Sequence, residues 1–431
     1  MFSLLRERDF GLLWLAGLIS YAGNAALTVV FPLHVYRLTD STLVTAIILA
    51  TYFLPRVLFS SVAGVFVDRW DRKRTMIGAD LGRAVVLLPI LIAPGDVPLL
   101  GVVAVVQGTI AVFFAPAESA LLPTLVGENR LVAANALNAL NNNIGMLIGP
   151  AMGALLYAEF SFRGTVLADT ATFIISASLI RLIVADARPE GSAGIVSSGA
   201  AWTRMASDWR AGMSVIRREL SLRVLLASSL LVSVAQGVFL TLGLSPLVLD
   251  VLGGTPAQVG WLGTAQAIGG ITAGLIVVRI GHRMTTRWLY GGGLIGIGLA
   301  DLGAANAARI ATIGTPAVGV AMGWMIVAGF PVVAAGAGLQ ALVQTHTTDA
   351  YRGRVFGTLS SVSGIALIVG FAVGGVLGSS AGIVPVLSAA ALLRALGGVV
   401  AILFLPRHPQ QSSSTIESEA SHVHERQQSV T

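Results

Sequence analysis

The stretch of sequence that decides the fold reads Gly64-Val-Phe-Val-Asp68-Arg69-Trp70-Asp71-Arg72-Lys73-Arg74. Its last seven residues include six charges, and it lies between two long apolar segments, 42–67 and 75–93. A helix needs about 20 apolar residues to cross the hydrocarbon core of a bilayer, so both segments are long enough to span it. The charged run is therefore expected to be a short turn at the membrane surface, and its basic excess marks the cytoplasmic side.

The composition is that of an integral membrane protein. Of 431 residues, 55% are hydrophobic and only 11% are charged, and the mean hydropathy is +0.82. Soluble domains carry about 25% charged residues. The net charge of +6 comes from cations scattered in short loops, which argues against a nucleic-acid partner. The chain has no cysteine, which excludes disulfides and thiolate metal sites.

The apolar runs predict an all-α integral membrane protein with about twelve transmembrane helices. The first run is too long for a signal peptide and is expected to be the first span. Basic residues gather in the loops of one side, which places both termini in the cytoplasm. The expected spans are 10–36, 42–67, 75–93, 98–125, 131–158, 163–184, 222–250, 257–279, 286–305, 316–342, 353–379 and 382–405.

The spans divide into two six-helix bundles, 1–185 and 222–406, which are joined by a cytoplasmic linker, 186–221, and followed by a disordered tail, 407–431. In the linker, apolar and small residues recur at helical spacing. This amphipathic helix either lies in the membrane interface or only joins the two halves. The residues with this spacing are Trp202, Met205, Trp209, Gly212 and Ile216. In the tail, His422 and His424 lack a third ligand, so no metal site is expected.

The two halves are related by an internal duplication. Gly64 has a counterpart 210 residues later in Gly274, again followed by a basic turn, but Val278 stands where Asp68 stood. The halves are therefore pseudo-symmetric, although the acid of the charged turn occurs only in the first. An offset of 221 residues aligns Glu128 with Asp349, Gly149 with Gly370 and Gly153 with Gly374.

The sequence excludes several other functions. It contains no Gly-Lys pair, so it cannot form a phosphate-binding loop, and ATP-driven transport by this chain alone is excluded. The pattern Gly291-x-Gly293-x-x-Gly296 lies within an expected span, where small residues serve helix packing. No catalytic constellation is present, so we expect neither an enzyme nor a cofactor.

The fifth expected span carries a stripe of amides and glycines at helical spacing, with Pro150 beside it. Glycines at every fourth position let another helix approach closely, and asparagines on the same face are costly against lipid. The stripe either packs tightly within its bundle or forms a contact between the halves whose bend favours one direction of opening. Its members are Asn135, Asn138, Asn142, Gly145, Gly149 and Gly153.

Ionisable residues inside spans are the default candidates for function. Arg56, Asp80, Arg83 and Glu118 fall in the cytoplasmic half of spans two to four. They form either a static set of ion pairs or a site where Asp80 or Glu118 exchanges a proton for a bound cation. Asp169 and Arg394 are further isolated charges to which the sequence assigns no partner.

On these motifs the chain resembles the major facilitator superfamily, and within it the drug:proton antiporters of the macrolide, tetracycline and multidrug efflux branch, of actinobacterial type. The resemblance covers about 95% of the length, spans one to twelve. It is carried by the turn Gly64 to Arg74, by Gly145-x-x-x-Gly149-Pro150-x-x-Gly153, by Leu54-Pro55-Arg56, by Asp80-Leu-Gly-Arg83, and by Pro123 followed by Asn135.

The chain departs from the family pattern at several positions. Asp71 replaces a glycine of the loop signature, and Ala136 and Ala154 replace glycines of the span-five signature. Ala104 stands where the span-four signature carries a membrane-buried arginine that the family uses in proton coupling. Arg56 or Arg83 is the candidate to take over that role.

The resemblance implies two bundles that rock about a central cavity. Gly64, Asp68, Arg69 and Arg72 are then expected to form a conformational latch. In this hypothesis Asp68 lies beside the start of span eleven, near 352–354, and closes the cytoplasmic side.

The implied function is export of lipophilic or cationic drugs in exchange for protons, across a bacterial inner membrane, by a monomer driven by the proton gradient. Two alternatives are export of one native metabolite or siderophore, and a membrane sensor or scaffold that does not transport. The residues expected to line the cavity are Asn24, Asn138, Asn142, Gln236, Phe239, Gln266 and Trp324.

Overall fold

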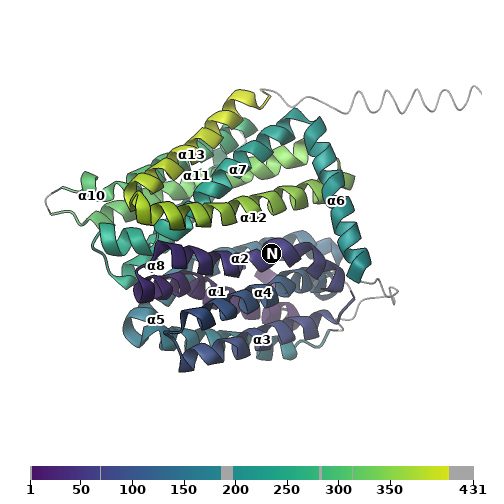
Figure 1. Cartoon of the computed structure of the whole chain (residues 1–431). Coiled ribbons are helices and arrows are strands. Elements are labelled where there is room, and N and C mark those ends of the chain that lie inside the picture. The colour runs from purple at the N-terminus through teal and green to yellow at the C-terminus, as the bar shows by residue number, and fades with distance from the viewer. Residues whose placement is uncertain (1, 68, 186–197, 281–283, 313, 407–431) are drawn as a thin grey trace, which may run out of the picture.

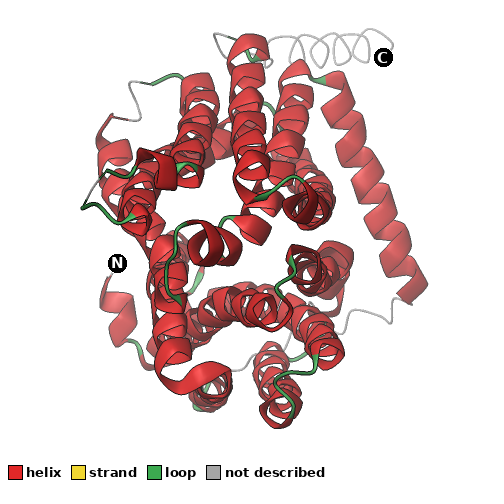
Figure 2. Ribbon diagram, turned by 60° about the vertical axis from the view of Figure 1, so that its left-hand side comes forward, coloured by secondary structure: helices red, strands yellow, loops and turns green. Residues whose placement is uncertain are grey.

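The computed structural model describes residues 2–67, 69–185, 198–280, 284–312 and 314–406. Within these ranges the chain forms helices joined by short loops, and no strand (Figure 2). Nine of the helices searched there are long and apolar enough to cross a membrane. The expected all-α membrane fold is confirmed.

In the first half, four helices occupy the first four expected spans, and a fifth occupies two. Aspartates start two of them, because Asp71 accepts a hydrogen bond from the backbone N–H of Arg74 and Asp96 accepts one from that of Leu99. The helices are α1 (Arg8–Thr39), α2 (Thr42–Val67), α3 (Arg72–Ile92), α4 (Val97–Val126) and α5 (Leu131–Arg181), with short 3-10 turns at Phe2–Arg6 and Glu128–Arg130.

The helix α5 continues through both spans five and six. Only Ser161 departs from helical geometry, with φ 61° and ψ −174°, and this single residue turns the chain between the two spans. Such a backbone conformation is strained for any residue with a Cβ atom.

In the second half, one expected span is shorter than predicted. The run 222–250 forms a helix only to Leu242, and a separate π-helical turn, Leu247–Val251, follows. The remaining elements match expected spans. The elements are α6 (Ser198–Arg218) in the linker, then α7 (Leu220–Leu242), α8 (Pro256–Ile280), the turn Trp288–Gly292 leading into α9 (Gly293–Ala305), α10 (Ala307–Ile310), α11 (Ala317–Thr345), α12 (Asp349–Ser380) and α13 (Ile383–Phe404).

The helices form two groups, which Figure 1 shows one above the other. The helices α1 to α5 form the lower, first group. The upper, second group consists of α7, α11, α12 and α13 together with α8 and α9, which pack against α11 and α13. The linker helix α6 runs across the right-hand ends of the helices of both groups. We call this end the α6 side. There α1 and α12 begin and α2 ends, and the other end is the opposite side.

The two groups share a hydrophobic core at the opposite side only. One cluster of buried residues there joins the end of α1, for example Leu33, with Val248, Val259 and Leu387 of the second half. At the α6 side the buried residues form separate clusters, one around Leu13 and Leu121 in the first group and one around Leu225 in the second.

Direct contacts between the groups lie at the opposite side as well. The Thr42 hydroxyl donates a 2.8 Å hydrogen bond to the backbone carbonyl of Gly375, so α2 meets α12 where α2 begins. The Tyr36 hydroxyl donates to the Asp250 carboxylate across the same interface. In this state the halves share a buried core only at the opposite side, and the contact between α2 and α12 continues from there at least to Val57, which lies against Gly364.

Candidate functional site

One face of α1 carries the residues around which the candidate site is built. Gly17, Ser20, Tyr21 and Asn24 follow one another at helical spacing of three, one and three residues, so they lie on one stripe. This stripe faces the other helices of the first group, and three buried carboxyl side chains lie against it or beside it. Their residues are Asp80, Glu118 and Asp169.

Asp80 and Arg83 form a buried ion pair one helical turn apart on α3. The Ser20 hydroxyl donates a 3.4 Å hydrogen bond to the Asp80 carboxylate, which ties the pair to α1. The Arg83 guanidinium lies 4.3 Å from the ring centroid of Phe173 and 5.1 Å from that of Phe114. A guanidinium held by a carboxylate and two rings has little freedom to move.

Gln107 connects this pair to α4. Its amide donates a 3.0 Å hydrogen bond to the backbone carbonyl of Arg83. It lies one helical turn after Ala104, the position where the expected arginine is missing. The only buried arginine in the described part of the first group is therefore Arg83, on α3.

Glu118 is buried between α4, α1 and α5. It is 4% exposed, and Tyr21 donates a 2.8 Å hydrogen bond to one carboxylate oxygen while Asn138 donates a 3.4 Å bond to the other. Gly17 makes room for it, because a Cβ there would lie 3.3 Å from the Glu118 carboxylate. Both of these donors are neutral.

Asp169 is the third buried carboxyl group. It is 2% exposed and accepts a 3.2 Å hydrogen bond from the Thr172 hydroxyl on the same helix, α5. Gly23 of α1 lies against it so closely that any side chain at that position would collide with the carboxylate. The partner that the sequence did not assign is therefore a neutral threonine, with glycine providing the space.

These placements leave the core of the first group with unequal charges. Among the described residues of that group, three carboxyl groups and one guanidinium are buried. Among the described residues of the second group, one carboxyl group and one guanidinium are buried, those of Asp301 and Arg394. An excess of buried carboxylates is costly unless protons or other cations neutralise it.

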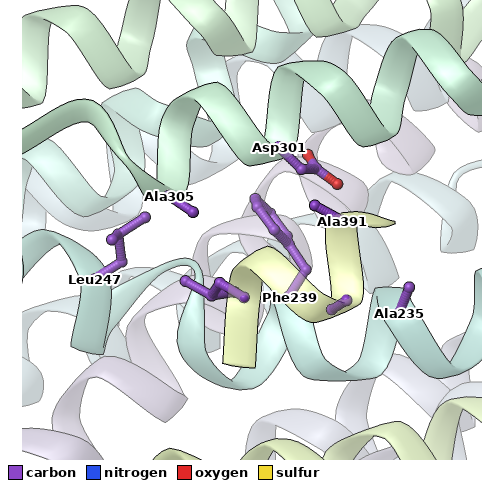
Figure 3. Close-up of a pocket in the computed structure, with 8 residues that line it drawn as sticks. Ala235, Phe239, Leu247, Asp301, Ala305 and Ala391 are labelled. Atoms are coloured by element: carbon purple, nitrogen blue, oxygen red, sulfur yellow. The ribbon is translucent and has the colours of Figure 1, made fainter. Parts of the chain in front are cut away.

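Asp301 and Arg394 form a buried ion pair between α9 and α13. The other end of the guanidinium donates a 2.8 Å hydrogen bond to the side-chain oxygen of Gln236 on α7 and lies 5.9 Å from the ring centroid of Phe239. Figure 3 shows Asp301 and Phe239 beside a narrow crevice with mainly alanine and leucine walls. Arg394 is thus partnered, and Gln236 and Phe239 belong to its surroundings.

The sequence analysis missed Asp301, although a signal was present, because it is an ionisable residue inside the expected span 286–305. The two buried pairs are built differently. Asp80 pairs with an arginine of its own helix, whereas Asp301 pairs with Arg394 of another helix, α13.

Comparison with known proteins agrees with this architecture. The family model described as Major Facilitator Superfamily matches residues 13–253 and, a second time, residues 225–429. The chain belongs to the Major Facilitator Superfamily. A match to each half is consistent with the internal duplication, and membership of this family indicates a transporter rather than an enzyme.

Relatives in the superfamily include two efflux proteins. The chain is 28% identical over 416 residues to the multidrug efflux pump Tap of Mycolicibacterium fortuitum, which covers 92% of this chain and 95% of that protein. It is 27% identical over 280 residues to macrolide efflux protein A of Streptococcus pyogenes, which covers 63% and 67%. An uncharacterized MFS-type transporter of Bacillus subtilis, YfiS, is 28% identical over 364 residues, 82% of each chain.

Solved structures confirm the superfamily fold. A bacterial homologue of the iron transporter ferroportin, in an inward-facing state, superposes with a TM-score of 0.72 at 16% identity and covers 92% of this chain and 98% of that chain. A bacterial homologue of the human lysosomal transporter Spinster, also inward-facing, gives 0.71 at 14% identity and covers 92% and 96%.

The glycines of the span-five motif pack against α1 of their own group. A Cβ at Gly149 would lie 2.6 Å from the backbone oxygen of Ala22, and one at Gly153 would lie 2.8 Å from the Cα of Ala26. Pro150 instead faces the second group, because its backbone carbonyl closely contacts Gly260 of α8. In this state, the motif thus combines packing within one half and contact between the halves on two different faces of the helix.

The expected latch lies partly outside the described residues, since these do not include Asp68. A Cβ at Gly64 would meet no described atom within 4 Å, although Ala63 and Val67 at the same end of α2 are fully buried. Arg72 donates a 3.3 Å hydrogen bond to the hydroxyl of Thr124, within the first group. The latch remains a prediction. The expectation that the tail histidines form no metal site also remains a prediction, because they too lie outside the described part.

The remaining predicted residues are dispersed. The Asn24 side chain accepts a 3.0 Å hydrogen bond from the Tyr52 hydroxyl, and the Trp324 ring packs on Gly303 of its own group. Gln266 is half-buried and Asn142 is exposed. Arg56, near the middle of α2, is exposed as well, and no ion pair joins it to Asp80 or Glu118. The structure thus gathers Asp80, Arg83, Glu118 and Asn138 into one site, of which Arg56 is not an ion-pair partner in the described part of the chain.

Proposed function

We propose that this chain exports lipophilic, cationic compounds from a bacterial cytoplasm in exchange for protons, by alternating access. The observation that carries the proposal is the Glu118 carboxyl, buried at 4% exposure and held by the neutral donors Tyr21 and Asn138.

A buried carboxyl group in such surroundings has two inexpensive states. Protonated, it is neutral and keeps its hydrogen bonds; ionised, it needs a cation beside it, because an uncompensated buried charge costs several kcal/mol. Asp80 differs, since Arg83 already neutralises it. Glu118 is therefore expected to bind either a proton or a cation at any time. Replacing one by the other is the exchange that an antiporter requires.

The identity of the substrate is supported by two relatives. Tap is named a multidrug efflux pump and macrolide efflux protein A a macrolide exporter, and they align with 92% and 63% of this chain. Macrolides and many other drugs combine a large apolar body with an amine that is protonated at neutral pH. Such an amine is the cation that a buried carboxylate would bind.

Alternating access is supported by the distribution of the hydrophobic core. The halves share one core at the opposite side and have separate cores at the α6 side. Such a molecule can separate at the α6 side without disrupting either half. Exposed Arg56, in the middle of α2, fits a hydrated space between the halves better than lipid.

The orientation follows from the charges. The α6 side carries the basic turn Arg69–Arg74 and the arginines of α6, so it is assigned to the cytoplasm, together with both termini. In this assignment the structure represents an inward-facing state, which loads substrate from the cytoplasm. The energy source is the proton gradient, and no cofactor is needed.

The test is transport by purified protein in proteoliposomes carrying an imposed pH gradient, with a fluorescent cationic dye as the substrate. Glu118→Gln keeps the shape and one acceptor oxygen but cannot exchange a proton, so gradient-driven dye accumulation should fall at least about tenfold. The matched control is Glu128→Gln, the same change at an exposed position on the α6 side, which should transport as the unmodified protein does.

Wild-type accumulation by folded Glu118→Gln protein would contradict the assignment of Glu118. An unmodified protein that moves dye at the same rate with and without a proton gradient would contradict proton coupling itself. Competition by structurally unrelated cationic compounds is expected. Inhibition by a single native metabolite alone would instead identify a dedicated exporter.

A further inference from the structure

The linker helix α6 is attached to the second half by one of its faces. Asp208 forms a 2.9 Å ion pair with Arg354 of α12, and Gly212 lies so close to α12 that a Cβ there would be 2.6 Å from the backbone oxygen of Arg354. Ile216 on the same face is fully buried. Figure 1 shows that the helix lies across the ends of the spans. The ends of membrane spans lie where the hydrocarbon core gives way to headgroups.

The other face of α6 is exposed and basic. Its residues recur at the spacing of one helical stripe and line a surface hollow of about 340 Å³. Three of the six are arginines, all exposed, and no carboxylate is among them. We call this surface the arginine stripe. It consists of Trp209, Arg210, Met213, Ser214, Arg217 and Arg218.

The acids next to the arginine stripe are engaged elsewhere. Asp208 precedes it and pairs with Arg354, and Glu219 follows it and lies 3.6 Å from the ring of His346. Neither is an ion-pair partner of the three stripe arginines in the described part of the chain. A solvated helix face normally alternates charges of both signs. This face presents one sign beside an indole and a thioether.

We propose that the arginine stripe binds the phosphate headgroup of an anionic phospholipid of the surrounding bilayer. The guanidinium groups match phosphate in charge and hydrogen-bonding geometry. Trp209, which is 42% exposed, and Met213 supply apolar surface toward the acyl chains, as tryptophan does at membrane interfaces. The lipid then anchors α6 to the membrane, and through Asp208 it anchors the start of α12.

The experiment uses the full chain in nanodiscs of phosphatidylcholine, with or without phosphatidylglycerol. Each basic side chain near an anionic surface contributes about fivefold to binding, so three contribute about a hundredfold. The triple variant R210Q/R217Q/R218Q should lose about that factor in phosphatidylglycerol retained, as counted by native mass spectrometry. The matched control R6Q/R8Q/R181Q removes the same charge from exposed positions of the first half and should retain the lipid.

A second readout locates the lipid. Brominated phosphatidylglycerol should quench the fluorescence of Trp209, measured as the difference between unmodified protein and Trp209→Phe, whereas brominated phosphatidylcholine should quench it less. The triple variant should lose this difference in quenching. Equal retention by both triple variants, or quenching that ignores the headgroup, would overturn the proposal. Competition by soluble glycerol phosphate at concentrations similar to those of the lipid would identify a free-anion site and likewise overturn it.

Discussion

The Asp301–Arg394 pair allows the energetic role of a buried ion pair to be measured in this fold. Both side chains are buried, and in the described part of the chain the other polar and aromatic partners of the arginine are the neutral Gln236 and the ring of Phe239. Asp301→Leu keeps a branched side chain but leaves the guanidinium charge uncompensated. Removing one partner of a buried pair costs about 3–5 kcal/mol.

The double variant Asp301→Leu/Arg394→Met should recover nearly all of this loss. It removes both charges together and fills the space with apolar groups, a replacement that is often neutral in proteins. The expected coupling free energy in the mutant cycle is therefore about 3 kcal/mol or more. For a bundle of this size the single variant should lower the melting temperature by about 10 °C.

The coupling free energy is measured by thermal unfolding in detergent, monitored by fluorescence, of the unmodified protein, the two single variants and the double variant. Transport by the double variant should persist, because the second group's buried charges are already balanced. The corresponding change in the first group, Asp80→Leu/Arg83→Met, should likewise restore stability, because it also removes both charges of a buried pair together. A single variant as stable as the unmodified protein, or a double variant less stable than either single one, would refute the reasoning.

Two further predictions concern packing and pH. Gly149→Ala should destabilise the protein by about 1–3 kcal/mol in the same melting assay, because the new Cβ would meet a backbone oxygen of α1 at 2.6 Å. Gly323→Ala, where a Cβ meets nothing within 4 Å, is its control, and equal stability of the two variants would contradict the close-packing argument. Burial lowers the pKa of His346 below its usual value, against a smaller opposing effect of Glu219. Its contribution to stability is thus present above its unfolded pKa of about 6.5 and is lost as the pH falls below it. His346→Gln should flatten the fall in melting temperature between about pH 7 and pH 5, and an unchanged profile would exclude this role.

The fold could be predicted from the sequence because each span must bury its backbone in lipid. That demand produces long apolar runs, and ten of the elements follow them closely. The span 222–250 was the exception. Its apolar run continues to Val251, but the α-helix stops at Leu242, where Gly243 caps it. Hydropathy reports how long a run is, not where its helix ends.

The site was predictable in its residues but not in their partners. Charges inside apolar runs identified Asp80, Arg83 and Glu118, because lipid tolerates them only when they are buried in protein. Which acid pairs with Arg83 depends on how the helices are rotated about their axes. Residue spacing alone does not determine this rotation. The structure gives it Asp80 and leaves Glu118 to Tyr21. Of the polar stripe of α1 only Asn24 was predicted, and its other residues were overlooked because most of them are small and neutral.

The three carboxyl groups buried with one guanidinium in the first half have a consequence for bioenergetics. In the proposed exchange, a singly charged cation leaving against one proton entering would move no net charge, so such transport would depend on the pH difference alone. A doubly charged cation exchanged for the same proton would carry one elementary charge, which is worth about 2.3 kcal/mol per 100 mV of membrane potential. The same pump would then be insensitive to voltage for one drug and electrogenic for another.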